Sequence, residues 1–268
     1  MIKLVATDID GTILSDKKCF TEGVINCIKE LEDKSVKVVL VTGRMYAAAK
    51  LIAEELGLKT PVVSYQGGLI KKSFNNTETL YQRCIPIEDA KQIICWGRRN
   101  QIHLNLYCND TLYVEKDNDT IKKYTTQQNI NYKVASFDDI KLENINKLMA
   151  IDYHCPENVD SWVKDMGNQM THLYVIKSTP WFCEFSTKDA TKACAVNFLR
   201  EYWELKENEI LTIGDQDNDI ELLKAGDISV AMGNATDELK KYADYITDTV
   251  DNDGFVKAME KFILGVKG

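Results

Sequence analysis

Two acidic side chains separated by one residue, Asp8 and Asp10, follow the first apolar segment of the chain, residues 2–6. The segment has the composition of a strand. Because side chains alternate along a strand, both acids should leave the same face at its carboxyl end. Carboxylates about 4 Å apart repel by roughly 4 kcal/mol near a protein surface, so the pair needs a bound cation or a proton. Both needs suit catalysis, although Asp-Gly after a strand is also an ordinary turn signal.

A second segment of this kind follows an apolar strand expected over residues 38–41. It reads Thr42-Gly43-Arg44 and precedes a helical pattern over residues 45–56. Thr42 can donate a hydrogen bond to an oxyanion, and Gly43 lets backbone N–H groups approach the same anion closely. The positive end of the helix adds to the attraction. A plain strand-to-helix turn would give the same pattern.

A lysine and an acidic loop complete the set. Lys192 begins a helical pattern that runs to about residue 203, a place where a lysine is more often a solvated surface charge. A strand over residues 210–214 leads into the acidic loop 215–219 and a short helix over residues 220–225. Carboxylates of this kind suit Mg²⁺. A calcium-binding loop is the rival interpretation, but that signature joins two helices, whereas these acids follow a buried strand.

Taken together and in this order, the four segments resemble the haloacid dehalogenase superfamily, in particular its Cof-like type IIB phosphatases. The resemblance covers the whole chain. It implies that Asp8 is the nucleophile and Asp10 the general acid/base. It further implies phosphate binding by Thr42, Gly43, Lys192 and Asn218, and a Mg²⁺ site formed by Asp8, Asp10 through its carbonyl, Asp215 and the nearby Asp219.

The sequence departs from the family pattern at two positions. The family commonly has Asn-Gly after its third strand, whereas this chain has Gln66-Gly67, which lengthens the amide by one methylene. The family lysine is usually followed by glycine, and here Ala193 takes that place. A small residue still fits there, so we expect the glutamine to matter more.

The order of the elements predicts the fold class. The 268 residues, 44% of them hydrophobic, are enough for two domains. Strand and helix patterns alternate up to about residue 65 and again from residue 192, as in parallel βαβ units. We therefore expect an α/β protein with a doubly wound, Rossmann-like parallel-sheet core and an inserted α+β cap domain. The expected core is 1–84 and 184–268, and the expected cap is 85–183.

The predicted cap alternates helices with antiparallel strands. Expected helices span 87–100, 120–129 and 157–167, and expected strands span 102–107, 112–115, 146–153, 171–177 and 181–186. Ligands of open α/β sheets bind beyond the carboxyl ends of the strands, so a cap there would contact the part of the substrate that is not phosphate. Candidate specificity residues are Arg44, Gln66, Gly67, His103, Trp181 and Glu184.

These features predict a Mg²⁺-dependent phosphatase that hydrolyses small phosphate monoesters, sugar phosphates first, through an aspartyl-phosphate. A sugar phosphomutase or phosphotransferase would use the same nucleophile. A non-catalytic phosphometabolite-binding protein is the third hypothesis, and the intact Asp8, Asp10, Lys192 and Asp215 argue against it.

Composition restricts the partners. The net charge is −8 without a lysine or arginine block, which argues against nucleic acid and anionic membranes as partners. The eight cysteines include no C-x-x-C pair, so neither a zinc site nor a disulfide framework is indicated. No apolar run approaches a membrane span and no signal peptide is expected. We expect a cytoplasmic monomer or weak homodimer whose partner is a small phosphorylated metabolite.

Overall fold

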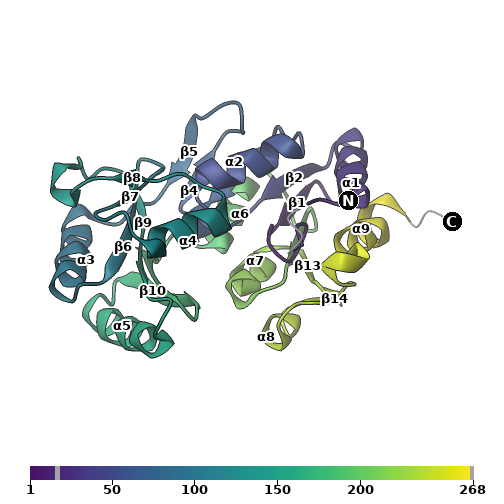
Figure 1. Cartoon of the computed structure of the whole chain (residues 1–268). Coiled ribbons are helices and arrows are strands. Elements are labelled where there is room, and N and C mark those ends of the chain that lie inside the picture. The colour runs from purple at the N-terminus through teal and green to yellow at the C-terminus, as the bar shows by residue number, and fades with distance from the viewer. Residues whose placement is uncertain (16–18, 266–268) are drawn as a thin grey trace. The chain divides into compact units, whose positions relative to one another are not determined.

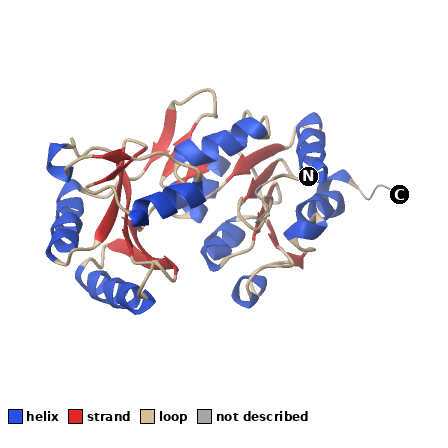
Figure 2. Ribbon diagram, viewed as in Figure 1, coloured by secondary structure: helices blue, strands red, loops and turns tan. Residues whose placement is uncertain are grey.

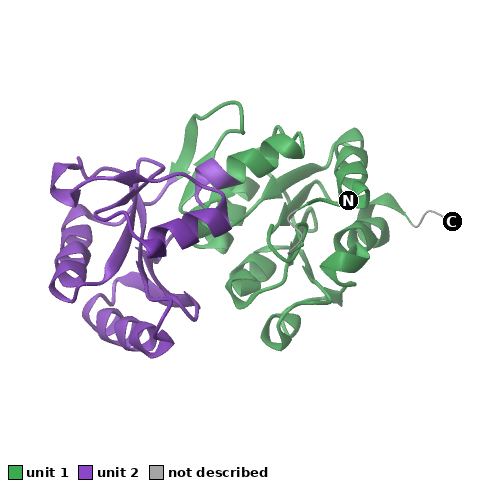
Figure 3. Cartoon of the chain, in the orientation of Figure 1, with its two compact units in different colours: residues 1–44, 49–81, 191–268 green, residues 45–48, 82–190 purple. Residues whose placement is uncertain are grey.

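The computed structural model describes residues 1–15 and 19–265 (Figure 1). The chain divides into two compact units (Figure 3). Unit 1 consists of residues 1–44, 49–81 and 191–268, and unit 2 consists of residues 45–48 and 82–190. Apart from one short helical piece, unit 2 is therefore an insertion into the sequence of unit 1.

Unit 1 is built on a parallel sheet with the strand order β14-β13-β12-β1-β2. Figure 2 shows the strands of the chain in red and the helices in blue. The strands of this sheet are β1 Leu4–Thr7, β2 Lys37–Leu40, β12 Ile210–Gly214, β13 Ile228–Ala231 and β14 Tyr245–Ile246. Every residue of β1 and β12 is buried, as expected for central strands of a sheet covered on both faces. Because β1 lies between β12 and β2 in this parallel sheet, the carboxyl ends of these three strands lie side by side at the same edge of the sheet.

Two pairs of helices in unit 1 pack against each other, and at least one member of each pair contacts the sheet. The helices of this unit are α1 Glu22–Asp33, α2 Tyr46–Glu55, whose first residues are grouped with unit 2, α6 Lys192–Tyr202, α7 Ile220–Ala225, α8 Asp237–Lys240 and α9 Gly254–Met259. Helix α1 packs against β2 and α9, whereas α6 packs against α7. Leu4 and Ala6 of β1 share an apolar cluster with Ala195 and Leu199 of α6. This cluster fixes the start of α6 relative to β1.

A second sheet of unit 1, with the order β3-β4-β5, extends from the end of β2. Its strands are β3 Val62–Ser64, β4 Leu69–Lys71 and β5 Thr79–Gln82. Val41 forms a parallel bridge with Val63, and the backbone N–H of Thr42 donates to the Val63 carbonyl at 3.2 Å. The sequence did not indicate β4 or β5, because three or four residues are too few to show strand periodicity.

Unit 2 contains a six-stranded sheet with the order β10-β11-β9-β6-β7-β8. The strands are β6 His103–Cys108, β7 Thr111–Val114, β8 Lys133–Val134, β9 Ile145–Ile151, β10 Leu173–Thr179 and β11 Phe182–Thr187. All neighbours are antiparallel except β7 and β8. Among these neighbours, β6–β7 and β10–β11 are hairpins, whereas β7 and β8 are joined through α4 (Asp119–Gln128).

The two faces of the unit 2 sheet differ in polarity. Leu104 and Leu106 of β6 belong to an apolar core with residues of α3 (Ile87–Arg99) and α5 (Pro156–Gln169). The opposite face carries Tyr107, whose hydroxyl donates to that of Tyr124 in α4 (Asp119–Gln128) at 2.6 Å. Strand alternation thus gives one apolar face and one face with polar side chains.

The observed α/β architecture, with a parallel-sheet core and a separate antiparallel sheet, confirms the predicted fold class. Helix α7 has the predicted bounds, and α3 ends one residue before the predicted end. Strand β11 ends at Thr187, one residue past the predicted end, where its last two residues pair with β10. No helix in the described parts of the chain is long and apolar enough to cross a membrane.

Gly67 offers a test of how tightly unit 1 is packed where α6 begins. Its φ is +104°, and a Cβ atom there would lie 2.1 Å from the backbone carbonyl oxygen of Thr191. Because the overlapped atom belongs to the backbone, no side-chain rotation could relieve this contact. We therefore expect Gly67→Ala to lower the free energy of unfolding by about 3 kcal/mol or more. Urea unfolding measures the change.

Gly57→Ala is the matched control, because Gly57 also has a positive φ of +70° but no atom within 4 Å of the added Cβ. It should cost only about 1–2 kcal/mol, the price of the left-handed conformation alone. Equal losses in the two variants would contradict the close packing of Gly67 against Thr191.

Candidate active site

Asp8 and Asp10 follow β1 in the sequence but lie in different environments. The Asp8 side chain is 10% exposed and that of Asp10 is 55% exposed, with the fully buried Ile9 between them. Gly11 then turns the chain with a φ of +80°, and a Cβ there would lie 2.2 Å from Oδ2 of Asp215. The glycine is therefore what allows the Asp215 loop to approach the end of β1.

Lys192 is buried, with only 1% of its side chain exposed, at the first residue of α6. Thr191 caps this helix by accepting a hydrogen bond from the Cys194 N–H at 3.1 Å. The Lys192 ammonium donates to Asp8 Oδ1 at 2.6 Å and to Asp219 Oδ1 at 2.5 Å. Lys192 is thus not on the surface, where lysines usually lie, but is buried between two carboxylates that it bridges.

The acidic loop after β12 supplies two carboxylates with different partners. Asp219 is fully buried, and its second oxygen accepts the backbone N–H groups of Asp215 at 3.0 Å and of Gln216 at 3.1 Å. Both Asp219 oxygens therefore already have protein donors. Asp215 accepts hydrogen bonds from the Thr12 hydroxyl at 2.9 Å and from the Gln216 amide at 3.0 Å.

The cluster carries more negative than positive charge. One buried ammonium, that of Lys192, faces the carboxylates of Asp8, Asp215 and Asp219. Burial raises the pKa of Asp8 to about 8, with Asp219 adding repulsion and Lys192 opposing the shift. Burial and the charge of Asp219 likewise raise the pKa of Asp215 to about 6. The site is therefore short of a cation.

A divalent metal ion fits this donor set. One ligand oxygen each from Asp8, Asp215 and Asp219 lies within 4.8 Å of the others. Since Asp219 is occupied by Lys192 and two backbone N–H groups, Asp8 and Asp215 are the better candidates for direct ligands. Hard carboxylate oxygens with room for water are the donors that Mg²⁺ prefers. The Asp10 carboxylate is not part of the cluster.

The predicted phosphate-binding segment lies in unit 1 at the end of β2. Thr42 is buried, its N–H bonds to β3, and its hydroxyl oxygen accepts the Arg44 N–H at 3.2 Å. Its own O–H hydrogen can then be donated to a ligand oxygen. The Arg44 guanidinium contacts the Asp10 carboxylate, at 2.7 Å through Nε and 2.5 Å through Nη2.

Gln66 lies in a strained turn beside this segment. Tyr65 and Gln66 both have positive φ values, 51° and 58°, and the Gln66 N–H donates to the Thr42 carbonyl at 3.0 Å. The Gln66 side-chain oxygen accepts from the Asn218 amide at 3.3 Å. Two predicted ligand-binding side chains from different loops are thus in contact.

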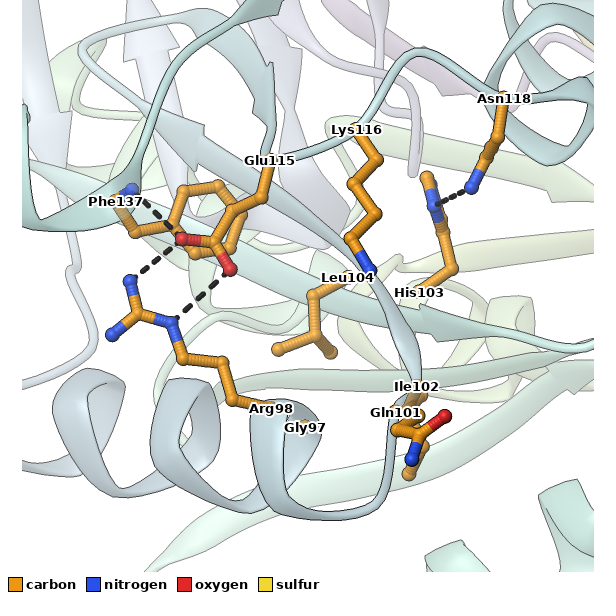
Figure 4. A pocket seen from close by; sticks show the side chains of 10 residues that line it. All are labelled: Gly97, Arg98, Gln101, Ile102, His103, Leu104, Glu115, Lys116, Asn118 and Phe137. Carbon is orange, nitrogen blue, oxygen red and sulfur yellow. Dashed lines mark hydrogen bonds and ion pairs between the residues drawn. The ribbon is translucent and has the colours of Figure 1, made fainter.

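The predicted specificity residues of unit 2 lie on or near its polar sheet face. His103 lies in the wall of a cavity of about 260 Å³, where Figure 4 shows its ring facing Asn118, at 3.2 Å between Nδ1 and Nδ2. Its Nε2 lies 3.0 Å from Oδ1 of Asn105. Burial lowers the pKa of His103, which favours a neutral ring.

Glu184 and Trp181 have contrasting surroundings. Glu184 accepts a bond from the buried Lys147 ammonium at 3.0 Å and another from the Ser178 hydroxyl. Trp181 is 36% exposed and its ring lies 6.4 Å from that of Tyr153. Glu184 is thus held by internal partners, whereas Trp181 presents an accessible aromatic surface.

Sequence reasoning assigned no role to three residues that support the site. Thr12 and Gln216 position Asp215 through the hydrogen bonds given above. Asn234 donates to the Gly11 carbonyl at 2.9 Å and accepts the Val250 N–H at 2.8 Å, which ties the turn after β1 to the C-terminal part of unit 1. Glycine and asparagine at the end of an apolar strand were the available signal for Asn234.

Comparisons with known proteins show which family this chain resembles. A model of the haloacid dehalogenase-like hydrolase family matches residues 5–259. A 5-amino-6-(5-phospho-D-ribitylamino)uracil phosphatase of Bacillus subtilis is 30% identical over 98% of this chain and 96% of its own length. A second Bacillus subtilis phosphatase with the same named substrate is 26% identical over 97% of each chain.

Solved structures are similar over nearly the whole chain as well. A Thermotoga maritima protein of 30% identity superposes with a TM-score of 0.87 and covers 97% of both chains. A haloacid dehalogenase-like hydrolase from Bacteroides thetaiotaomicron, 25% identical, superposes with a TM-score of 0.89 over 97% of this chain and 99% of its own.

The raised pKa values predict how Mg²⁺ stabilisation should depend on pH. Without metal, Asp8 and Asp215 hold protons that an unfolded chain releases above about pH 4, so this contribution to stability falls as the pH rises towards 8. Mg²⁺ binds the deprotonated carboxylates and competes with those protons. We therefore expect saturating MgCl₂ to raise the melting temperature more at about pH 8 than at about pH 5.

Asp215→Asn should remove most of this increment and its pH dependence. Asp217→Asn is the matched control, because Asp217 lies on the same loop but outside the acidic cluster and accepts a bond from Thr236 instead. A melting-temperature increment that is independent of pH, or that is lost equally in both variants, would contradict a metal site at Asp8 and Asp215.

Proposed function

This chain belongs to the haloacid dehalogenase-like hydrolase family and is a phosphoric monoester hydrolase, and from this premise we propose that it hydrolyses small sugar phosphates with Mg²⁺ through an aspartyl-phosphate on Asp8. The observation that carries the proposal is the buried contact of Lys192 with Asp8, beside Asp215. A nucleophile, a fixed cation and a candidate metal ligand in one cluster are the parts that phosphoryl transfer requires.

In the first step of the proposed reaction, a carboxylate oxygen of Asp8 attacks phosphorus. The bond from phosphorus to the leaving-group oxygen breaks, and its electron pair leaves with that oxygen. Asp10 donates a proton to it, so the product departs as an alcohol. The ammonium of Lys192 holds the attacking carboxylate in place and offsets part of the negative charge around it.

In the second step, Asp10 takes a proton from water, whose oxygen attacks the phosphorus of the aspartyl-phosphate. The bond from phosphorus to Asp8 breaks, and the electron pair restores the Asp8 carboxylate. An acid at position 10 serves in both steps because it is a carboxylate after the first and a carboxylic acid after the second.

Mg²⁺ would be held by Asp8, the carbonyl of Asp10 and Asp215, and would supply positive charge beside the phosphoryl group. The Thr42 hydroxyl, Lys192 and Asn218 would contact the phosphoryl oxygens as hydrogen-bond donors. The backbone N–H of Gly43 would approach the same oxygens at the end of β2. This donor set recognises the phosphate, which all monoesters share.

A sugar or sugar-alcohol phosphate is the substrate class that we favour. The two Bacillus subtilis relatives are named for a substrate whose phosphate is carried by a ribityl chain. Discrimination between such esters must come from groups that reach beyond the phosphate, and His103, Trp181 and Glu184 remain the sequence-based candidates in unit 2. A phosphorylated ribitylamino compound therefore belongs in the first substrate panel.

Replacement of the nucleophile tests the covalent step. Asp8→Asn keeps the shape of the side chain but removes the attacking oxygen anion, so turnover of any phosphate ester should fall by about four orders of magnitude. Acid quenching with labelled substrate should trap the phosphoryl group on wild-type Asp8 and leave the variant unlabelled. Label on another residue would overturn the assignment.

The reaction class can be tested with isotopically labelled water and a substrate panel. In H₂¹⁸O, hydrolysis should place one heavy oxygen in each phosphate released from a sugar phosphate, and a chelator should stop the release. Release that survives thorough metal removal would contradict the Mg²⁺ requirement. Transfer of the phosphoryl group to an added sugar, without free phosphate and without ¹⁸O in the product, would favour the phosphomutase or phosphotransferase alternative.

A further inference from the structure

The Arg44 guanidinium contacts both oxygens of the Asp10 carboxylate. Its Nε donates to Oδ2 at 2.7 Å, and its Nη2 donates to Oδ1 at 2.5 Å. This is the bidentate arrangement that fixes the plane of a carboxylate as well as its position. The Arg44 side chain is only 19% exposed, whereas that of Asp10 is 55% exposed. A largely covered cation thus holds a carboxylate that remains accessible.

Arg44 is itself fixed through its backbone. Its N–H donates to the Thr42 hydroxyl oxygen at 3.2 Å, and its carbonyl accepts the Tyr65 N–H at 2.9 Å. The guanidinium is therefore attached to the same loop that presents Thr42 and Gly43. The Arg44 side chain thereby links the Asp10 carboxylate to the loop that carries the predicted phosphate-binding groups.

The contact with Arg44 opposes the electrostatic repulsion between the Asp10 carboxylate and the nearby acidic cluster. Asp8 lies two residues away, and Asp215 and Asp219 add to the negative charge. Repulsion between carboxylates would favour rotation of Asp10 toward water. The fork formed by the two Arg44 nitrogen donors supplies a positive charge and a defined direction, and it leaves the Asp10 carboxylate, though not the Asp10 carbonyl, outside the group of candidate metal ligands.

We propose that Arg44 is a positioning residue for Asp10, which aims the carboxyl group at the oxygen whose proton it exchanges, rather than a residue that selects the substrate. A carboxylate offers about four lone-pair positions, and the fork uses one on each oxygen. The remaining positions can exchange a proton with the leaving group and then with water. The proposal rests on the reaction proposed above.

Leaving groups that differ in their need for a proton separate this role from phosphate binding. 4-Nitrophenolate leaves without protonation, whereas a sugar alkoxide requires an acid. In quenched-flow experiments, Arg44→Met should form the phosphoenzyme from 4-nitrophenyl phosphate within about threefold of the wild-type rate. With the sugar phosphate that wild type hydrolyses fastest, the same step should slow by about 10²–10³ fold.

Water activation also depends on Asp10, so the variant should release phosphate slowly after a burst of 4-nitrophenolate. Arg44→Lys retains a cation but not the two-pronged contact, and it should restore the sugar-phosphate rate only in part. In an Asp10→Asn background, Arg44→Met should change the rates by less than about threefold, because the partner through which it acts is already lost.

Arg200→Met is the matched control. Arg200 contacts the carboxylate of Asp227 through both terminal nitrogens, at 2.9 and 3.3 Å, in the same unit but away from the acidic cluster. Its loss should lower the melting temperature and leave both phosphoenzyme-forming rates unchanged.

Two results would overturn the proposal. A similar rise in KM for both esters with kcat retained would make Arg44 a phosphate-binding residue, and full additivity with Asp10→Asn would show that it acts independently of Asp10. Failure of the proposed function itself would be recognised separately, as a wild-type protein that forms no phosphoenzyme on Asp8.

Discussion

The buried ammonium of Lys192 is the interaction on which the site depends. Removing an ammonium from water costs several kcal/mol, and the cost is offset only while well-placed carboxylates remain in contact. Asp8 and Asp219 provide them, and Asp219 is held in turn by two backbone N–H groups of its own loop. The first strand, the start of α6 and the acidic loop after β12 are therefore fixed by one connected set of charges.

The same set of charges makes the stability of the folded protein depend on the cation that it binds. Three carboxyl groups face one ammonium in a buried place, so their ionised forms would carry a surplus of negative charge. Burial, together with the charge of Asp219, therefore raises the pKa values of Asp8 and Asp215. A site neutralised completely by the protein would be more stable but would have no affinity for a metal ion. The surplus of carboxylates therefore lowers the stability of the metal-free protein and provides the affinity for a metal ion.

The sequence predicted those features that local pattern determines. The apolar runs before Asp8, Thr42 and Asp215 predicted the strand ends, and the order of the segments predicted the family. Side-chain partnerships that link distant positions had no local signal. Taken alone, Lys192 was expected on the surface, and it is buried because its partners lie 184 and 27 positions away. The contact of Glu184 with Lys147 was equally invisible, because it depends on strand register.

Gln66 shows how a departure from the family pattern can be accommodated. The backbone of Tyr65 and Gln66 keeps positive φ values that cost about 1–3 kcal/mol each, and bonds to Arg44 and Thr42 hold it there. With the backbone fixed, the extra methylene must extend the amide away from the turn. It extends to Asn218 on the acidic loop. The longer side chain therefore adds a link between the loops that follow β3 and β12, and its amide stays beside the groups that would bind phosphate.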